Sequence, residues 1–530
     1  MATATALASS GLPALTPAAA ERIDPKRLVA FLAMCFGMFM AFLDIQVVSA
    51  SLAEIQAGLA ASSDEITWVQ TSYLMAEVVA IPLSGFLSRA LGTRIMFAVA
   101  AAGFTFASLM CGLTSSMSQM IVWRAVQGFI GGGMVPTVFA SAYIIFPRSR
   151  MPVIIPLIGL IATLAPTVGP TVGGYLTDAL SWHWLFFINI IPGILVTIAA
   201  ITLIDFDRPD YALFETFDWV GLISMAAFLG ALEYVLEDGP RYDWFDDSTI
   251  ALIAVVSASS AVIFLVRMLT ARNPIVDLRA FLDRNFALGS VFSFVLGIGL
   301  YGLTYLYPVF LGEIRGYDAL MIGRTMFVSG AAMFLSAPLV GRLMTQFDPR
   351  LMLAFGFVIF GLSSWEATTV TTDWDFAQLL VPQVLRGVGL MFAIVPITNL
   401  ALGTLPPDRL KNASGLFNLT RNLGGAVGLA TLNTVLDDRI DLHLARLHES
   451  ITWSRLPAME TLSGLAARIP GSDARAMALK QLFLMVHQQG VVMAFADVFL
   501  MLAVVYVAFA GLVVLMRRPP PAAAGASAGH

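Results

Sequence analysis

Charged residues and cysteine are scarce in this 530-residue sequence. Only 12% of its residues are charged, against about 25% in ordinary globular domains, and 58% are hydrophobic, which excludes a soluble fold. Its 30 basic residues do not outnumber its 35 acidic ones, so the chain lacks the positive surplus that binding to nucleic acid requires. Both cysteines, Cys35 and Cys111, lie in long apolar runs, which excludes a disulfide framework.

Catalytic signatures are missing as well. The sequence has no P-loop, no His-Glu-x-x-His and no nucleophile elbow, and we expect no cofactor. Without a P-loop, ATP is not the expected energy source. His443 and His448 are five residues apart and so do not share a helical face, and we expect no metal site there. A membrane enzyme or sensor stays open only as a remote alternative.

Long hydrophobic runs are the dominant feature. A bilayer core roughly 30 Å thick takes about 20 residues of helix. Fourteen such runs cover residues 28–50, 66–88, 95–115, 118–140, 151–174, 183–204, 217–237, 248–270, 286–311, 320–341, 351–371, 376–400, 412–436 and 491–516. The sequence therefore predicts an all-α membrane protein with 14 spans in a lipid bilayer.

The distribution of lysine and arginine predicts the orientation. If the N-terminus is cytoplasmic, eighteen of them fall on the inner side, three in short outer loops and six in the long outer loop 437–490. Positive residues concentrate in cytoplasmic loops, and long loops count little, so both termini are expected in the cytoplasm. Residues 1–27 are expected to form a disordered tail rather than a signal peptide, and residues 517–530 a second tail.

An internal repeat divides the chain. Residues 82–87, followed by Arg94, match residues 338–343, followed by Arg350, at the same interval. A weaker match relates Arg124 in the fourth span to Arg386 in the twelfth. We expect two six-helix halves. Gene duplication in any membrane protein would produce the same kind of repeat, so the repeat by itself does not indicate a function. The predicted bounds of the halves are residues 28–204 and 285–516, with two inserted helices and linkers at 205–284.

Several motifs resemble those of a known family. Arg124-Ala-Val-Gln127-Gly128 resembles the R-x-x-Q-G signature of major facilitator transporters, and the run containing Pro166, Gly169, Pro170, Gly173 and Gly174 resembles the antiporter signature of exporters. The segments around Asp44, Gln70 and Tyr73, Asn189, and Arg421 resemble the fourteen-span drug:proton antiporters of the EmrB/QacA branch, on the EmrB side. The resemblance covers nearly the whole chain.

This resemblance implies a major facilitator fold with a substrate site near the midplane between the halves. It implies proton-coupled export of lipophilic or cationic drugs across the bacterial inner membrane by alternating access. Export of an endogenous metabolite, siderophore or fatty acid by the same fold is the alternative. It further implies a periplasmic adaptor and an outer-membrane channel as partners, with loop 437–490 either a docking surface or a solvated cap.

One motif departs from the family pattern. The cytoplasmic loop after the second span keeps Gly85, Gly92 and Arg94, but Arg89 stands where most members have an aspartate. The aspartate-based latch of the family therefore does not carry over to this chain.

Ionisable residues inside a bilayer are costly and usually face a cavity or pair with each other. Asp44 and Arg124 lie at equal depth, about six residues from the outer ends of their spans, so we expect them to pair. Proton affinity at Asp44 would then depend on whether the pair is intact and how wet the cavity is. A coupling pair and a static structural ion pair are both open interpretations.

Other acids are less defined. Glu77, near the middle of the second span, is a candidate second proton site or an anchor for a cationic drug, with a hydrogen-bonded structural glutamate as the alternative. Glu233 and Asp497 lie nearer the outer ends of their spans, where contact with interfacial water is the simpler expectation.

Polar and aromatic residues of other spans are candidates for the substrate cavity. We expect Gln70, Tyr73, Glu77, Tyr301, Tyr305, Asn418 and Arg421 there, although most aromatic side chains face lipid or neighbouring helices. Arg421 and Arg386 are each expected to contact a carboxylate or an anionic group, or else backbone carbonyls. The glycines and prolines of the antiporter signature allow either gating or rigid packing.

Overall fold

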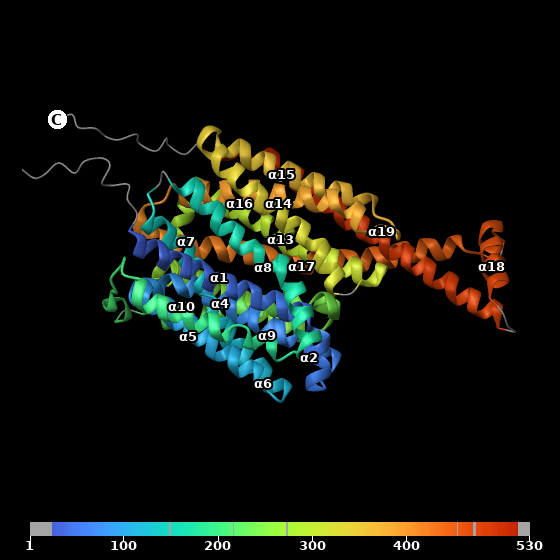
Figure 1. Ribbon diagram of the computed structural model, residues 1–530, viewed down its shortest axis with the longest axis horizontal. Helices are drawn as coiled ribbons and strands as arrows, with labels where there is room; N and C mark the ends of the chain where they lie inside the picture. Colours follow the sequence, from blue (N-terminus) through green and yellow to red (C-terminus); the bar gives the residue numbers. More distant parts are fainter. Residues whose placement is uncertain are drawn as a thin grey trace, which may run out of the picture.

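The computed structural model describes residues 24–147, 150–215, 217–271, 274–317, 319–452, 454–469 and 473–517. Within these ranges the regular structure is helical, with α-helices joined by short 3-10 turns. Residues 1–23 and 518–530, which hold most of the two expected tails, lie outside the described residues. The helices form an elongated bundle with a projection at one end of its long axis (Figure 1).

The helices follow the expected spans closely. The main helices of the first half are α1 (Pro25–Ala50), α4 (Trp68–Ala90), α5 (Gly92–Gly112), α6 (Met117–Gly131), α7 (Met134–Ile145), α8 (Met151–Ala179), α9 (Trp184–Phe187) and α10 (Ile190–Leu203), with the short α2 (Leu52–Leu59) and α3 (Ser63–Ile66) after α1. They continue with α11 (Trp219–Asp238), α12 (Ser248–Thr270), α13 (Arg284–Arg315), α14 (Ala319–Gln346), α15 (Pro349–Glu366), α16 (Phe376–Leu402), α17 (Pro407–Ser450), α18 (Leu456–Arg468) and α19 (Ala474–Leu512).

Among the described residues, twelve segments are long and apolar enough to cross a bilayer, two of them formed by the pairs α6–α7 and α9–α10. The 29-residue α8 and the 44-residue α17 lie in the same bundle and contact its spanning helices. With these two, fourteen segments traverse the bundle, in agreement with the sequence. The chain is a multi-pass, all-helical membrane protein.

Aspartate side chains mark several helix starts. Asp218, Asp247 and Asp283 accept hydrogen bonds from backbone amides in the first turns of α11, α12 and α13. Such caps satisfy amides that a helix start leaves unpaired, and each contributes about 1 kcal/mol. These polar breaks separate the apolar runs and therefore set the boundaries of the spans.

Packing within and between the halves explains the shape. In the first half α1 packs on α8 and α10, and α4 on α6; in the second half α13 packs on α17, and α15 on α16 and α19. Across the halves α8 contacts α14, and α17 contacts α4 and α7. The inserted helix α11 contacts its partner α12 and also both α4 and α17, so it lies against both halves.

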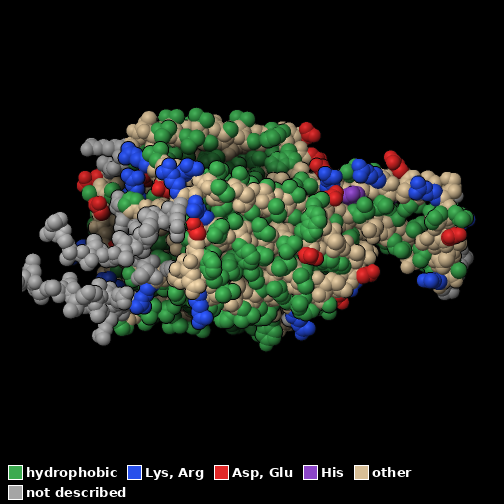
Figure 2. Space-filling view, turned by 90° about the horizontal axis from the view of Figure 1, so that it is seen from above, with side chains coloured by type: hydrophobic (Ala, Val, Ile, Leu, Met, Phe, Trp, Pro, Cys, Tyr) green, Lys and Arg blue, Asp and Glu red, His purple; other side chains and the backbone are tan. Residues whose placement is uncertain are grey.

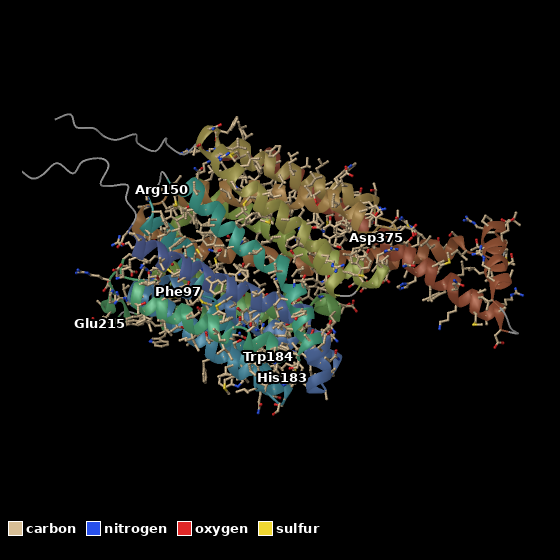
Figure 3. All side chains as sticks on the ribbon, in the orientation of Figure 1. Phe97, Arg150, His183, Trp184, Glu215 and Asp375 are labelled. Carbon is tan, nitrogen blue, oxygen red and sulfur yellow. The ribbon has the colours of Figure 1, made fainter. Side chains whose placement is uncertain are left out.

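The two ends of the bundle differ. At one end, which we call the terminal end, α1 begins and α19 finishes, and Arg150 and Glu215 lie there (Figure 3). The opposite, or hairpin, end carries Asp375 and the projecting segment (Figure 3). In the space-filling view, Lys and Arg side chains gather toward the terminal end and along the projection, and the surface between is mostly hydrophobic (Figure 2).

The projection replaces most of the expected loop 437–490. Instead of ending near residue 436, α17 continues to Ser450, and α19 already begins at Ala474, with α18 between them (Figure 1). Asp497 joins the two long helices, because it lies 2.9 Å from His443 Nε2 and 3.5 Å from Arg439. His443 is therefore buried in a helix pair rather than on a solvated surface, and the same contacts occupy Asp497.

Candidate functional site

A buried ion pair lies inside the first half. Arg124 of α6 contacts Asp44 of α1 at 2.6 Å, and both side chains are completely shielded from solvent. Equal depth in the sequence pointed to this contact. Breaking such a pair by removing one partner leaves an uncompensated buried charge, which is strongly destabilising.

Neutral donors complete the coordination of Asp44. Asn189 donates to Asp44 Oδ1 at 2.7 Å and Gln127 donates to the same oxygen at 3.1 Å. Arg124 also donates to the Val69 carbonyl at 2.9 Å and lies 4.2 Å above the Tyr73 ring. The pair is thus held by side chains from four helices or helix ends, and it is closed on all sides.

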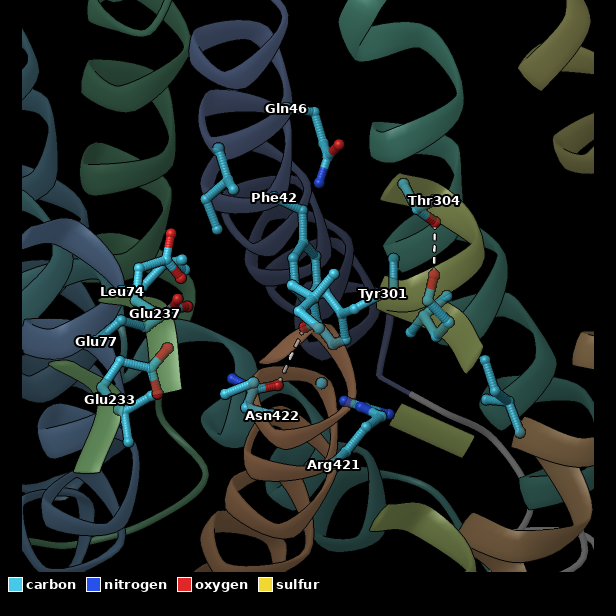
Figure 4. Close-up of a pocket in the computed structure, with 18 of the residues that line it drawn as sticks. Phe42, Gln46, Leu74, Glu77, Glu233, Glu237, Tyr301, Thr304, Arg421 and Asn422 are labelled. Atoms are coloured by element: carbon cyan, nitrogen blue, oxygen red, sulfur yellow. Dashed lines mark hydrogen bonds between the residues drawn. The ribbon is translucent and has the colours of Figure 1, made fainter. Parts of the chain in front are cut away.

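A separate cavity, with about 100 Å³ of space open to water-sized molecules, lies between the two halves. It is lined by Phe42, Ile45, Gln46, Leu74, Glu77, Val78, Phe139, Gly159, Ala162, Glu233, Glu237, Leu300, Tyr301, Thr304, Ile394, Arg421, Asn422, Gly425, Ala426 and Leu429. Figure 4 shows its polar side chains on an otherwise apolar surface. Such a chamber, mostly apolar with a few convergent polar groups, is typical of a small-molecule site.

Opposite charges face each other across this cavity. Glu77 of α4 and Glu233 and Glu237 of α11 form one wall, and Arg421 of α17 stands on the other (Figure 4). Arg421 hydrogen-bonds to Asn418 and lies 5.8 Å above the Phe139 ring. Tyr301 donates to Asn422 Oδ1 at 3.1 Å beside it. The acidic wall thus presents three carboxyl groups, and the described residues of the facing wall include one arginine.

The expected cavity residues divide into two groups. Glu77, Tyr301 and Arg421 line the cavity. Gln70, Tyr73, Tyr305 and Asn418 are not among its lining residues. Tyr73 is buried against Arg124. Asn418 accepts a hydrogen bond from Arg421, and Tyr305 is 38% exposed. Asp44 is also outside the lining, one layer behind it.

Glu233 differs most from its sequence-based interpretation. We expected it to reach interfacial water, yet it is only 5% exposed and faces the cavity. Its position near the end of α11 is readable from the sequence. Its direction is not, because it depends on how α11 rotates against α4 and α17.

The second half has its own buried arginine. Arg386 of α16 donates to Thr304 Oγ1 of α13 at 2.5 Å and to Gln383 at 3.4 Å. In the described part of the chain no Asp or Glu lies within ion-pair distance of it. The two expected contacts, a carboxylate and backbone carbonyls, are therefore not among its described partners, which include a hydroxyl and a side-chain amide.

Gly169 and Gly173 of the antiporter-like run lie on the face of α8 that packs on α1. A side chain at Gly173 would meet the Val47 carbonyl at 2.9 Å, and one at Gly169 would clash with Gln46. Pro170 and Gly174 lie half-buried in the same helix; Pro166 lies in α8 as well, but its side chain is outside the described residues. Small residues thus allow α8 and α1 to approach closely.

At the terminal end, the loop motif packs on the second half. A side chain at Gly85 would lie 3.1 Å from the Lys411 carbonyl of α17. Gly92 adopts φ +76°, a left-handed conformation that glycine accommodates without strain. Arg94 donates to the Ile204 carbonyl, and the Arg89 carbonyl accepts from the Asp210 amide at 3.2 Å.

Asp207 connects this loop motif to the second half. It lies in the linker after α10 and accepts from the Thr93 amide at 2.9 Å and the Thr93 hydroxyl at 2.6 Å. Lys411 of α17 lies 2.5 Å from the same carboxylate and donates to the Ser88 carbonyl at 3.0 Å. An aspartate thus joins the first half to α17, although it comes from a different loop.

Comparisons with known proteins agree with this architecture. The family model of the Major Facilitator Superfamily matches residues 34–429. The chain is 41% identical to the colistin resistance protein EmrB of Acinetobacter baumannii over 92% of this chain and 96% of that protein. It is 29% identical to the multidrug export protein EmrB of Escherichia coli K12, over 94% and 97%.

Two further similarities come from a fatty acid resistance protein and a solved structure. Identity to FarB of Neisseria gonorrhoeae is 30% over 93% of this chain and 97% of that protein. The crystal structure of the human organic anion transporter MFSD10 superposes with a TM-score of 0.57 at 11% identity, covering 91% of this chain and 100% of that one. The chain therefore belongs to the Major Facilitator Superfamily of membrane transporters, in its EmrB branch.

Proposed function

We propose that this protein is a proton-coupled exporter of lipophilic cationic compounds in the bacterial inner membrane. The terminal end, with its gathered Lys and Arg side chains, faces the cytoplasm, and both termini lie there. The hairpin end faces the periplasm. The observation that carries the proposal is the shielded Asp44–Arg124 pair beside a cavity with an acidic wall.

Coupling follows from the position of Tyr73 and Glu77. These residues are one turn apart on α4, so they share a helical face. The Tyr73 ring lies under Arg124, and Glu77 lines the cavity. A cation bound at Glu77 therefore lies one layer from the ion pair. Protonation of Asp44 frees the charge of Arg124, which repels that cation, so proton uptake and cation binding oppose each other.

Drug-dependent proton movement in reconstituted vesicles tests this proposal. We expect the parent to move protons when drug is added, and Asp44→Asn to lose the exchange while keeping drug binding. Asp373→Asn is a matched control, because it makes the same change at an exposed aspartate between α15 and α16 that is not among the residues lining the cavity. Parental proton-to-drug exchange in Asp44→Asn would leave Asp44–Arg124 as a static structural pair.

Glu77 has two proposed roles that one assay separates. If Glu77 is a second proton site, Glu77→Gln changes the proton-to-drug ratio. If Glu77 is instead an anchor for the drug, the same substitution changes which drugs are transported. Its place on the cavity wall supports both roles.

The substrate class is inferred from the cavity charge. Three carboxyl groups against one arginine favour cations, and Phe42 and Tyr301 supply apolar and aromatic contact. The relatives named for colistin and multidrug resistance agree with this class. FarB, named for fatty acid resistance, supports the alternative of an anionic substrate held by Arg421. Growth-inhibition tests with cationic drugs and long-chain fatty acids, with and without the protein, distinguish the two.

Alternating access requires that the terminal end open and close. In this structure it is closed by Lys411–Asp207 and by Ser414, which donates to the Pro136 carbonyl at 2.9 Å. The glycine face of α8 on α1 is the proposed gating element, because small side chains let the two helices slide.

The hairpin is the proposed docking surface for a periplasmic adaptor that leads to an outer-membrane channel. The α17–α18–α19 projection extends well beyond the bundle (Figure 1). Co-purification with the adaptor tests this when the projection is shortened by matched lengths of α17 and α19. Unchanged adaptor recovery would make the projection a solvated cap.

A further inference from the structure

The inserted helix α11 places a carboxyl group in the cavity that its neighbours leave unsatisfied. Glu233 is 5% exposed, and its Oε2 accepts no hydrogen bond from any residue that the structure describes. A buried polar atom without a partner is costly. Asp44, by contrast, has three side-chain donors. Glu233 is therefore poorly explained as a structural acid.

The direction of Glu233 is set by contacts on both sides of α11. The next residue, Tyr234, packs on Trp68 of α4, with ring centroids 5.6 Å apart. Just after α11, Trp244 donates to Thr434 of α17 at 3.0 Å. These contacts hold α11 between the two halves and keep Glu233 on the cavity wall (Figure 4).

The surroundings of Glu233 match a cationic ligand. Glu77 is on the same wall, and Glu237 lies one turn along α11. The nearest acids repel a lone negative charge, and the arginines are engaged elsewhere: Arg124 with Asp44, Arg421 with Asn418. Phe42 and Tyr301 border the same space. An organic ammonium or amidinium group is the partner that would satisfy this carboxylate.

We propose that Glu233 is a substrate-binding residue that selects for positive charge, so that the inserted helix pair supplies part of the site between the two halves. The proposal rests on the proposed export function and names one residue that sets its substrate class. It differs from a coupling role: Asp44 carries the proton, and Glu233 contacts the organic cation.

Binding to the purified full-length protein tests the assignment. Ethidium, tetraphenylphosphonium and pentamidine are titrated against the parent, Glu233→Gln and Glu233→Asp. We expect Glu233→Gln to weaken binding roughly tenfold to a hundredfold, as loss of a charged contact does, and Glu233→Asp to keep most of the affinity. Glu366→Gln, an exposed acid at the end of α15, is the matched control. Equal affinities in the parent and Glu233→Gln would overturn the proposal.

A second measurement needs no substitution. Dicyclohexylcarbodiimide modifies carboxyl groups in apolar surroundings when they are protonated, because the acid proton passes to the carbodiimide nitrogen as the carboxyl oxygen bonds to its carbon, and mass spectrometry locates the adduct on the α11 peptide. We expect ethidium to protect Glu233 from modification; modification that proceeds at the same rate with ethidium bound contradicts the proposal. If the parent binds none of the three cations, the proposed function fails as well. If the parent binds these cations and exchanges them for protons, but substitution of Glu233 does not change their affinity, only this inference fails.

Discussion

The two buried arginines of the repeat have opposite environments. Arg124 meets a carboxylate from α1, whereas Arg386 meets a hydroxyl from α13, the corresponding span of the second half. The halves share an arginine at a similar place, but only the first half supplies an acid. Among the described residues, the carboxylate proposed to carry the proton therefore pairs with the arginine of the first half, and the arginine of the second half has neutral partners. The two arginines occupy similar places in the helix packing but differ in their partners.

Removing each arginine is the strongest way to test this comparison. Arg124→Gln leaves Asp44 buried without its cation, and we expect a loss of about 3–5 kcal/mol in the free energy of unfolding. Arg386→Gln removes a cation with neutral partners only, and we expect a change below about 1.5 kcal/mol. Thermal unfolding in detergent measures both.

A double substitution provides the control. Adding Asp44→Asn to Arg124→Gln removes the orphaned charge, so part of the lost stability returns, as expected for residues in contact. Equal destabilisation by the two single arginine variants would remove the proposed asymmetry between the halves.

Glycine substitutions probe what the halves share. A side chain at Gly128 of α6 would clash with the Tyr73 carbonyl of α4, and one at Gly387 of α16 with the Ser329 carbonyl of α14. We expect Gly128→Ala and Gly387→Ala each to cost about 1–3 kcal/mol, because two helices must separate. Gly312→Ala, with no atom within 4 Å of the added carbon, serves as the control and does not destabilise. A large cost in only one half would show that the packing diverged too.

Lys411→Met tests the contact that joins the halves at the terminal end. Asp207 and Lys411 are mostly shielded, with 13% of each side chain exposed. Loss of this charge-assisted contact is expected to raise the population of the state open at the terminal end roughly tenfold. A cysteine introduced at Asn412 reports it through its rate of maleimide labelling. Arg342→Met removes an exposed charge from the same end and is the control; identical labelling in both variants would exclude a latch.

The smallest effect is expected at an exposed ion pair of the first half. Lys26 contacts Asp205 at 2.9 Å, and this hydrogen bond lowers the pKa of Asp205 below its usual value. A lowered pKa contributes stability above the ordinary pKa of aspartate and loses it as the pH falls through the lowered value. Lys26→Gln should therefore reduce the melting temperature slightly at neutral pH and not at acidic pH. A difference that persists in acid would place its cause outside the ion pair.

The depth of a residue within its span was predictable from the sequence, whereas the direction in which its side chain points was not. Asp44 and Arg124 were matched by depth alone, because helical rise is constant and both lie at the same distance from a span end. For Glu233 the same count placed the residue near an interface and missed the cavity that it faces. The rotation of α11 comes from contacts of Tyr234 and Trp244 with other spans, which no local pattern encodes.

Contacts between residues far apart in the chain were not predictable from the sequence either. Arg89 stands where the family pattern has an aspartate, and nothing local indicated that Asp207, from a different loop, contacts Lys411, 204 residues further along. The segment after residue 436 was expected to begin a long outer loop, and residues up to Ser450 continue α17 instead. The polar residues of this segment lower its hydropathy. The segment contains neither Gly nor Pro up to Ser450, so the helix is not interrupted.

The sequence by itself determined that this chain lies in a lipid bilayer, how many spans it has and that Asp44 and Arg124 lie at the same depth, since each follows from local composition, helical rise and the cost of polarity in hydrocarbon. Only the tertiary structure decided which acids reach the chamber between the halves and which are sealed behind it. That choice depends on the rotation and contact of helices far apart in the chain, and those are properties of packing rather than of any segment alone.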